Sequence, residues 1–152
     1  MDAVFNVNNE VFNYRVAGVL IKNNHVLLHK QVTDQHWSLP GGRVQVLEDS
    51  ATGVKREMQE ELGYTVEVEK LLWVTENFFT YQERTYHEIG FYYQLSNDNL
   101  NVTASPFYGE EGEQLIYQWI PLKVLNTITL YPEFLKSSLK ELPTNTQHII
   151  IK

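Results

Sequence analysis

The sequence contains no cysteine, which excludes disulfide bridges and thiolate metal sites. No apolar run approaches the roughly 20 residues that a membrane-spanning helix needs. Residues 1–10 lack the basic and apolar regions of a secretion signal. Because a chain without cysteine also fits a reducing compartment, we expect a cytoplasmic protein that does not contact membranes.

Positive charge is scarce as well. The 152 residues include 12 Lys and Arg against 19 Asp and Glu, which gives a formal net charge of -7. No basic stretch is dense enough to follow a long nucleic acid. Small anionic ligands remain compatible with this charge, because a bound cation can reverse the local field. A chain of this length, with 43% hydrophobic residues, predicts a single globular domain over residues 1–152.

Strand-like segments outnumber helix-like segments. Residues 14–21 and 25–29 are rich in β-branched and aromatic residues and flank an Asn-Asn turn, which predicts a hairpin. The remaining expected strands are residues 65–75, 87–95, 115–120 and 148–151, and the expected helices are residues 49–62 and 132–142. Because strands and helices do not alternate regularly, the pattern predicts an α+β fold with a mixed sheet flanked by helices.

The expected helix at residues 49–62 carries an acidic side. Glu57, Glu60 and Glu61 are three and four positions apart, so they project from the same side. The apolar stripe lies on another side and consists of Ala51, Val54, Met58 and Leu62. Clustered carboxylates repel one another, and a hard divalent cation such as Mg²⁺ or Mn²⁺ removes that penalty and also binds phosphate oxygens.

Three glutamates alone are more often a solvated helix face than a metal site. Arg56 could pair with Glu60 on the next turn or with Glu48 in the preceding loop, and either pair would hold the loop against the helix. Gly53 lies near the acidic side. It could leave room for a metal or a substrate, or it could be a tolerated helix glycine that costs about 1 kcal/mol.

The spacing over residues 42–64 resembles the Nudix box at every defining position. The segment has Gly42, five residues, Glu48, seven residues, and then Arg-Glu-Met-Gln-Glu-Glu-Leu-Gly-Tyr. The preceding hairpin, the Trp-Ser-Leu-Pro-Gly-Gly lead-in and the late Gln-Trp-Ile-Pro strand also resemble the family, so the resemblance covers about residues 14–125. It implies an α/β/α sandwich and a metal-dependent hydrolase that cleaves a diphosphate (pyrophosphate) linkage in a nucleoside diphosphate derivative.

The resemblance also implies roles for individual residues. By this likeness, Glu57, Glu60 and Glu61 would be catalytic metal ligands, and the carbonyl of Gly42 would add a further ligand. Glu48 and Arg56 would support the loop and the helix that carry these ligands.

A general base is expected from outside the box. Family members often place a glutamate in the loop before the late Trp strand, and this loop holds Glu110, Glu111 and Glu113. We favour Glu113, six residues before Trp119, over Glu111, with an ordinary acidic loop as the alternative. Further candidates are Glu76, Glu83 and Glu88.

Three positions depart from the common family pattern. Leu47 stands where glycine is frequent, Gln45 where glutamate is frequent, and Gly53 where alanine is frequent. None of the three removes an expected metal ligand. Leu47 bears on the geometry of the loop before the helix, and Gln45 removes one accessory carboxylate, so the number of metals is left open.

The box does not identify the substrate, which could be a nucleoside triphosphate, an oxidised nucleotide, ADP-ribose, a dinucleoside polyphosphate or a sugar nucleotide. Arg84 or Lys30 could meet a phosphate. Aromatic residues that could stack on a base, or pack in the core, are Phe78, Phe79, Tyr81, Tyr86, Phe107 and Tyr108. The partner is thus expected to be a small molecule and not a long nucleic acid.

Two other functions compete with the hydrolase. A non-catalytic Nudix-like nucleotide sensor would be expected to lack one of the metal-binding glutamates, and all are present. An RNA-end pyrophosphohydrolase is disfavoured by the acidic balance, because RNA binding usually needs a positive surface. We also expect a homodimer, in which the apolar side of residues 132–142 could be either core or interface.

Overall fold

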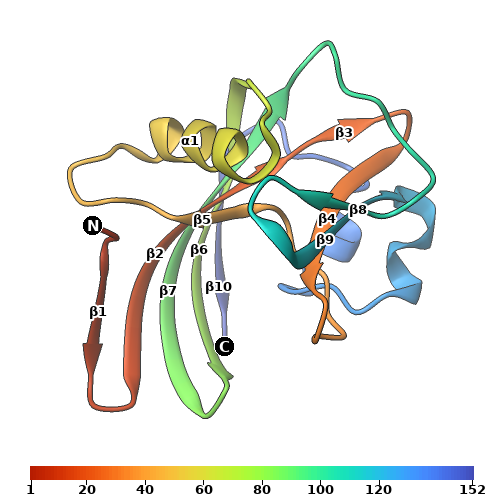
Figure 1. Cartoon of the computed structure of the whole chain (residues 1–152). Coiled ribbons are helices and arrows are strands. Elements are labelled where there is room, and N and C mark those ends of the chain that lie inside the picture. Colours follow the sequence, from red (N-terminus) through yellow and green to blue (C-terminus); the bar gives the residue numbers. More distant parts are fainter.

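The computed structural model describes all of residues 1–152 and contains two sheets with one long helix (Figure 1). In spatial order, the larger sheet consists of β1 (Val4–Val7), β2 (Glu10–Val19), β7 (Arg84–Ser96), β6 (Glu67–Tyr81) and β10 (Gln147–Ile151), with β5 (Gly41–Arg43) also paired to β2. The smaller sheet consists of β3 (Ile21–Lys22), β4 (His25–Gln31), β9 (Gly112–Pro121) and β8 (Phe107–Gly109).

The larger sheet is mixed, as predicted. Its β2–β7 and β6–β10 pairs are parallel, whereas β1–β2, β2–β5 and β6–β7 are antiparallel. The two strands β1 and β5 therefore share one edge of β2, and β5 joins the part of that edge that lies beneath the helix in Figure 1. This arrangement places Gly41, Gly42 and Arg43 at the edge of the larger sheet, where Gly42 faces α1.

The helix α1 (Ser50–Leu62) forms where the sequence predicts it. Its N-cap is Asp49, whose carboxylate accepts a hydrogen bond from the backbone N–H of Thr52. It ends at Gly63, which adopts a left-handed conformation with φ 70°. Val54 and Met58 are fully buried against the sheet in a core that also contains Val16, Tyr93 and Leu95.

A second core lies on the opposite face of the sheet, where η1 (Leu122–Thr127) and α2 (Leu135–Ser138) pack. Helices thus flank the mixed sheet on both faces, which confirms the predicted architecture. No helix has the length and apolar character needed to cross a membrane.

The predicted helix at residues 132–142 is wrong in its extent, because only Leu135–Ser138 are α-helical. The N–H of Lys140 bonds the carbonyl of Ser137, three residues back, so the chain leaves the α-helical path. Pro143 further disfavours helix in the residue before it. Leu135 and Leu139 are buried in the second core, so the apolar side of this segment is core.

The β6–β7 hairpin is longer than predicted. The sequence predicts strands only to residue 75 and again from residue 87, but the strands continue to Tyr81 and restart at Arg84. Gln82 and Glu83 form the two-residue turn with φ 49° and 66°. These are not the Asn or Gly residues that usually mark such a turn, whereas Asn23 and Asn24 do occupy the predicted β3–β4 turn with φ 52° and 60°.

Candidate active site

Arg56 connects the loop before α1 to the acidic side of the helix. Its Nε and Nη2 atoms donate to the two carboxylate oxygens of Glu48, at 2.7 and 3.0 Å. Its Nη1 donates to Glu57 at 2.9 Å and to Glu60 at 3.1 Å. Arg56 therefore forms both of the ion pairs that the sequence allowed, one with Glu48 and one with Glu60. The hydrogen bonds from Arg56 hold the pKa of Glu48 below its usual value.

Two residues that depart from the family pattern shape this loop. A side chain at Gly53 would place its Cβ 2.9 Å from Oε1 of Glu48, so Gly53 leaves room for that carboxylate and not for a metal or substrate. Leu47 has φ 70° and a fully exposed side chain. The loop therefore keeps the left-handed conformation that glycine adopts without strain.

Glu57 lies directly against Gly42. A Cβ on Gly42 would be 2.5 Å from the carboxyl carbon of Glu57 and 2.6 Å from each of its oxygens. Only glycine at position 42 therefore allows Glu57 its position. Burial raises the pKa of Glu57, while the hydrogen bond from Arg56 opposes the rise.

Glu61 is the most deeply buried of the three glutamates, with 6% of its surface exposed. Its Oε2 atom is buried without a hydrogen-bond partner. Burial, followed by the negative charge of Glu57, raises the pKa of Glu61 to about 8. Glu60, in contrast, is 49% exposed at its side chain. On the acidic side, the buried carboxylate of Glu61 therefore forms no ion pair with any cationic side chain.

This donor set suits a hard divalent cation in its chemistry, because it offers carboxylate oxygens and a buried acceptor that lacks a partner. No three His, Asp or Glu side chains converge closely enough here to enclose a metal ion. Arg56 is instead the cationic partner of both Glu57 and Glu60. A metal at this side would therefore share or replace the contacts of Arg56.

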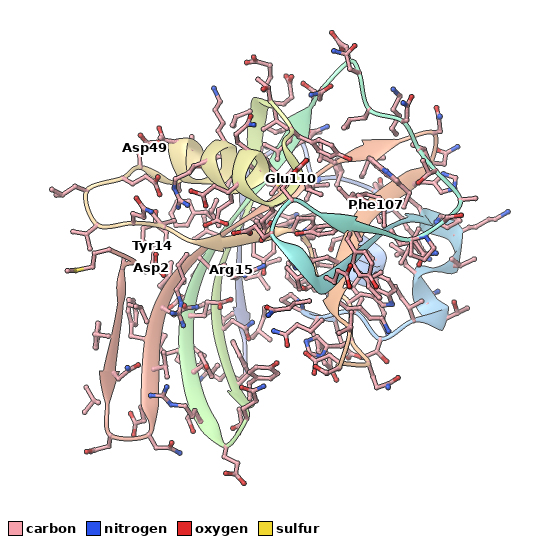
Figure 2. All side chains as sticks on the ribbon, in the orientation of Figure 1. Asp2, Tyr14, Arg15, Asp49, Phe107 and Glu110 are labelled. Atoms are coloured by element: carbon pink, nitrogen blue, oxygen red, sulfur yellow. The ribbon has the colours of Figure 1, made fainter.

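The loop that supplies the expected general base is fastened to the end of α1. The N–H of Glu110 donates to the backbone carbonyl of Glu61 at 2.7 Å, and Figure 2 shows Glu110 beside the helix. The charge of Glu111 contributes to the raised pKa of Glu61. Glu111 and Glu113 are both exposed, and Glu113 lies at the start of β9. Glu113 as the base stays a prediction, and Glu111, whose charge acts on Glu61, is the other candidate in this loop.

The other candidate residues lie in different surroundings. Glu76 pairs with His148 of β10 at 2.7 Å, and Glu83 lies in the β6–β7 turn. Lys30 lies over the ring of Trp37, with its Nζ 5.4 Å from the ring centroid. Among the candidate aromatics, Phe79 stacks on Tyr86, Phe78 packs on His87, and Phe107 stacks on Tyr117.

Sequence reasoning named Glu88 as a candidate but missed the polar residues that surround it in the larger sheet. On β2, Asn13 and Arg15 are two positions apart. Arg43 of β5 pairs with Arg15, and Glu88 of β7 pairs with Asn13. Glu88 is 7% exposed and accepts a hydrogen bond from Asn13 at 2.6 Å. The available signal was the alternation of Asn13 and Arg15 in an otherwise apolar strand, which places both on one face.

Comparison with known proteins identifies the family of this chain. The NUDIX domain family model matches residues 13–142. A Bacillus subtilis relative whose name refers to ADP-ribose pyrophosphatase is 33% identical over 81 residues, which are 53% of this chain and 37% of the relative. A MutT-like protein of Streptomyces ambofaciens is 43% identical over 63 residues, 41% of each chain. The chain thus spans about two fifths of the length of these two curated relatives.

The fold is also found among solved structures. A NUDIX hydrolase from Nitrosomonas europaea superposes with a TM-score of 0.62 at 22% identity, over 91% of this chain and 78% of that chain. At this level of identity the likeness concerns the fold alone.

Proposed function

This chain belongs to the Nudix family, and from that premise we propose that it is a pyrophosphohydrolase that uses Mg²⁺ or Mn²⁺ to cleave a diphosphate linkage in a nucleoside diphosphate derivative. The observation that carries the proposal is the buried, unpartnered carboxylate of Glu61 on the same helix side as Glu57 and Glu60. A protein gains nothing in stability from such a group, so its retention points to a ligand with positive charge.

The proposal assigns Glu57, Glu60 and Glu61 as the residues that hold the cation, with the Gly42 carbonyl as a further expected ligand. A bound cation of this kind polarises phosphoryl oxygens and lowers the pKa of a bound water. Arg56 keeps Glu57 and Glu60 on one side through its Nη1 atom. Glu48 fixes Arg56 in turn, because its two oxygens accept from two nitrogens of the guanidinium.

The general base is proposed to come from the loop before β9. A carboxylate there accepts the proton of the attacking water if it lies within reach of the helix glutamates. We assign this role to Glu111, because its negative charge acts on Glu61. The bond from the N–H of Glu110 to the carbonyl of Glu61 holds the loop in place. Glu113 is the alternative base.

The substrate class rests on charge and on the relatives. A net charge of -7 suits a small substrate that approaches together with a cation better than it suits a long nucleic acid. The Bacillus subtilis relative has a name that refers to ADP-ribose, which makes that compound a first candidate. The alternative of a non-catalytic sensor is weakened by the presence of all three glutamates.

The experiment is a hydrolysis panel with Mg²⁺ and, separately, Mn²⁺. ADP-ribose, nucleoside triphosphates, dinucleoside polyphosphates and sugar nucleotides are incubated with the wild type, Glu61→Gln and Glu141→Gln, and phosphate-containing products are measured. Glu141 is exposed near the C-terminal end of the second core and serves as a matched control. Turnover by the wild type and Glu141→Gln, but not by Glu61→Gln, supports the proposal. Nucleotide binding without cleavage by the wild type would instead indicate a sensor.

A further inference from the structure

The strand β1 lies at one edge of the larger sheet and pairs with a neighbour, β2, on its inner side only. The N–H of Tyr14 in β2 donates to the carbonyl of Ala3 at 3.2 Å. Hydrogen-bonded pairs alternate along an antiparallel ladder, so Ala3 and Phe5 direct their backbone groups toward β2. Val4 and Asn6 therefore direct theirs away from the sheet.

Three backbone groups on this outer side have no hydrogen-bond partner. They are the carbonyl of Val4 and both the N–H and the carbonyl of Asn6. The N–H of Val4 is already bonded to the carbonyl of Asp2, at 2.9 Å. A row of unpaired backbone groups along a strand is a template on which a further strand can pair.

The other sheet edges carry features that discourage such pairing, whereas β1 carries none. In the smaller sheet, β3 and β8 have only two and three residues, and a register shift interrupts the β8–β9 ladder. In the larger sheet, His148 of β10 pairs with Glu76 at 2.7 Å, and Lys152 follows the strand. Short strands, irregular ladders and charged side chains are the usual protection of an edge. The sequence of β1 is Val-Phe-Asn-Val, without charge or proline.

The side chains of β1 leave an apolar surface at this edge. Phe5 and Val7 are 59% and 56% exposed, and as alternate residues they lie on the same face of the sheet. The ring of Phe5 stacks on Phe12 with 5.0 Å between centroids, and Phe12 meets the ring of His87 at 5.2 Å. Neighbouring rings thus orient Phe5. In Figure 1, β1 lies on the outside of the sheet with no helix over it.

A second copy of this chain suits the edge in both geometry and charge. When a strand pairs antiparallel with its own copy, the two chains are related by a two-fold axis, which is the commonest symmetry of homo-oligomers. Each copy brings the same β-forming segment. The net charge of -7 makes two copies repel each other, but β1 is neutral. The adjacent Asp2 bridges to Gln45 of its own chain.

We propose that β1 pairs antiparallel with β1 of a second copy and that Phe5 lies on the two-fold axis. In this register Val4 lies opposite Asn6 of the second copy, so the outward backbone groups of the two strands bond one another. The two Phe5 residues then form a non-hydrogen-bonded pair, with Cα atoms about 4.5 Å apart and side chains in contact. The larger sheet continues from one chain into the other. The pairing does not rest on the proposed function.

The first test is the oligomeric state, measured by sedimentation equilibrium. An interface of this kind is small, so we expect a Kd of roughly 10–100 µM and a dimer with twice the 17.8 kDa mass of the chain at higher concentration. Phe5→Lys should be a monomer, because it places two charges on the axis. Asn6→Pro should also be a monomer, because it removes an outward N–H that the monomer does not use.

Ile150→Lys is the matched control. Ile150 is 58% exposed on β10, the strand at the other edge of the same sheet, and this variant should dimerise as the wild type does. The proposal is overturned if the wild type stays a monomer at about 500 µM, well above the expected Kd. It is equally overturned if Ile150→Lys abolishes the dimer while Phe5→Lys retains it, because β10 would then be the interface.

The second test concerns the register and uses single cysteines in a chain that has none. Phe5→Cys and Val7→Cys are each oxidised with oxidised glutathione, and cross-linked dimers are measured by non-reducing electrophoresis. The Cα separation of about 4.5 Å at Phe5 fits a disulfide. The two Val7 residues would lie four positions apart along the strands, about 13 Å, which is too far. Phe5→Cys should therefore cross-link and Val7→Cys should not. Equal cross-linking of both variants, or cross-linking of Val7→Cys alone, would refute the proposed pairing.

Discussion

Replacing Glu61 by glutamine removes a charge that the folded chain accommodates poorly. Glu61 is 6% exposed, and its Oε2 has no partner. Its pKa rises from an ordinary 4.5 to about 8, first because burial removes water from the carboxylate and then because Glu57 repels it. Glutamine has nearly the same shape, so the change tests the charge with little change in packing.

The direction in which stability changes with pH follows from the pKa of Glu61 in the unfolded state and in the folded state. A carboxyl with a raised pKa in the folded state contributes stability below the pKa of the unfolded state, and that contribution is lost as pH rises toward the folded pKa. Between pH 4.5 and pH 7 the unfolded chain releases the proton of Glu61 while the folded chain keeps it. At roughly 1.4 kcal/mol for each pH unit, the wild type should lose up to about 3 kcal/mol relative to Glu61→Gln.

The assay is urea unfolding in EDTA at pH 4.5, 5.5 and 7. The free energy of unfolding of Glu61→Gln minus that of the wild type should increase steadily toward pH 7. Mg²⁺ at pH 7 should then stabilise the wild type more than the variant, because a ligand of the folded state stabilises it by mass action. Glu141→Gln should show no such trend. A difference between Glu61→Gln and the wild type that stays constant across this pH range would refute the reasoning.

Three other predictions concern the loops around α1. Gly42→Ala should lower kcat by at least about tenfold, because its Cβ would displace the carboxyl of Glu57, and unchanged kcat would contradict this contact. Glu111→Gln should lower kcat by about 100-fold, while Glu113→Gln remains near the wild type; the opposite ranking would make Glu113 the base. Leu47→Gly should raise the urea midpoint, with a gain of about 1 kcal/mol, because φ 70° strains leucine and the exposed side chain makes no compensating packing. An unchanged or lower midpoint would show that the strain is absent.

Local patterns made much of the fold predictable. The span of α1 follows from Asp49 as N-cap, from Gly63 as the end and from the apolar stripe between them. The Asn23-Asn24 turn and its flanking strands were likewise visible as a hairpin. Weaker local signals failed, as in the turn at Gln82 and Glu83, where cross-strand pairing of β6 with β7 overrides the composition of the turn.

The sequence by itself determined which residues share one side of α1, because helical periodicity links positions that are three and four apart. It also identified the family, through the spacing of the glycine, the glutamates and the arginine. Only the tertiary structure decided that Glu61 is buried without a partner and that Glu57 lies against Gly42. It alone set Arg15 opposite Arg43 in the β2–β5 register. Burial and cross-strand contacts join residues that are distant along the chain, and no local pattern encodes which distant residues will meet.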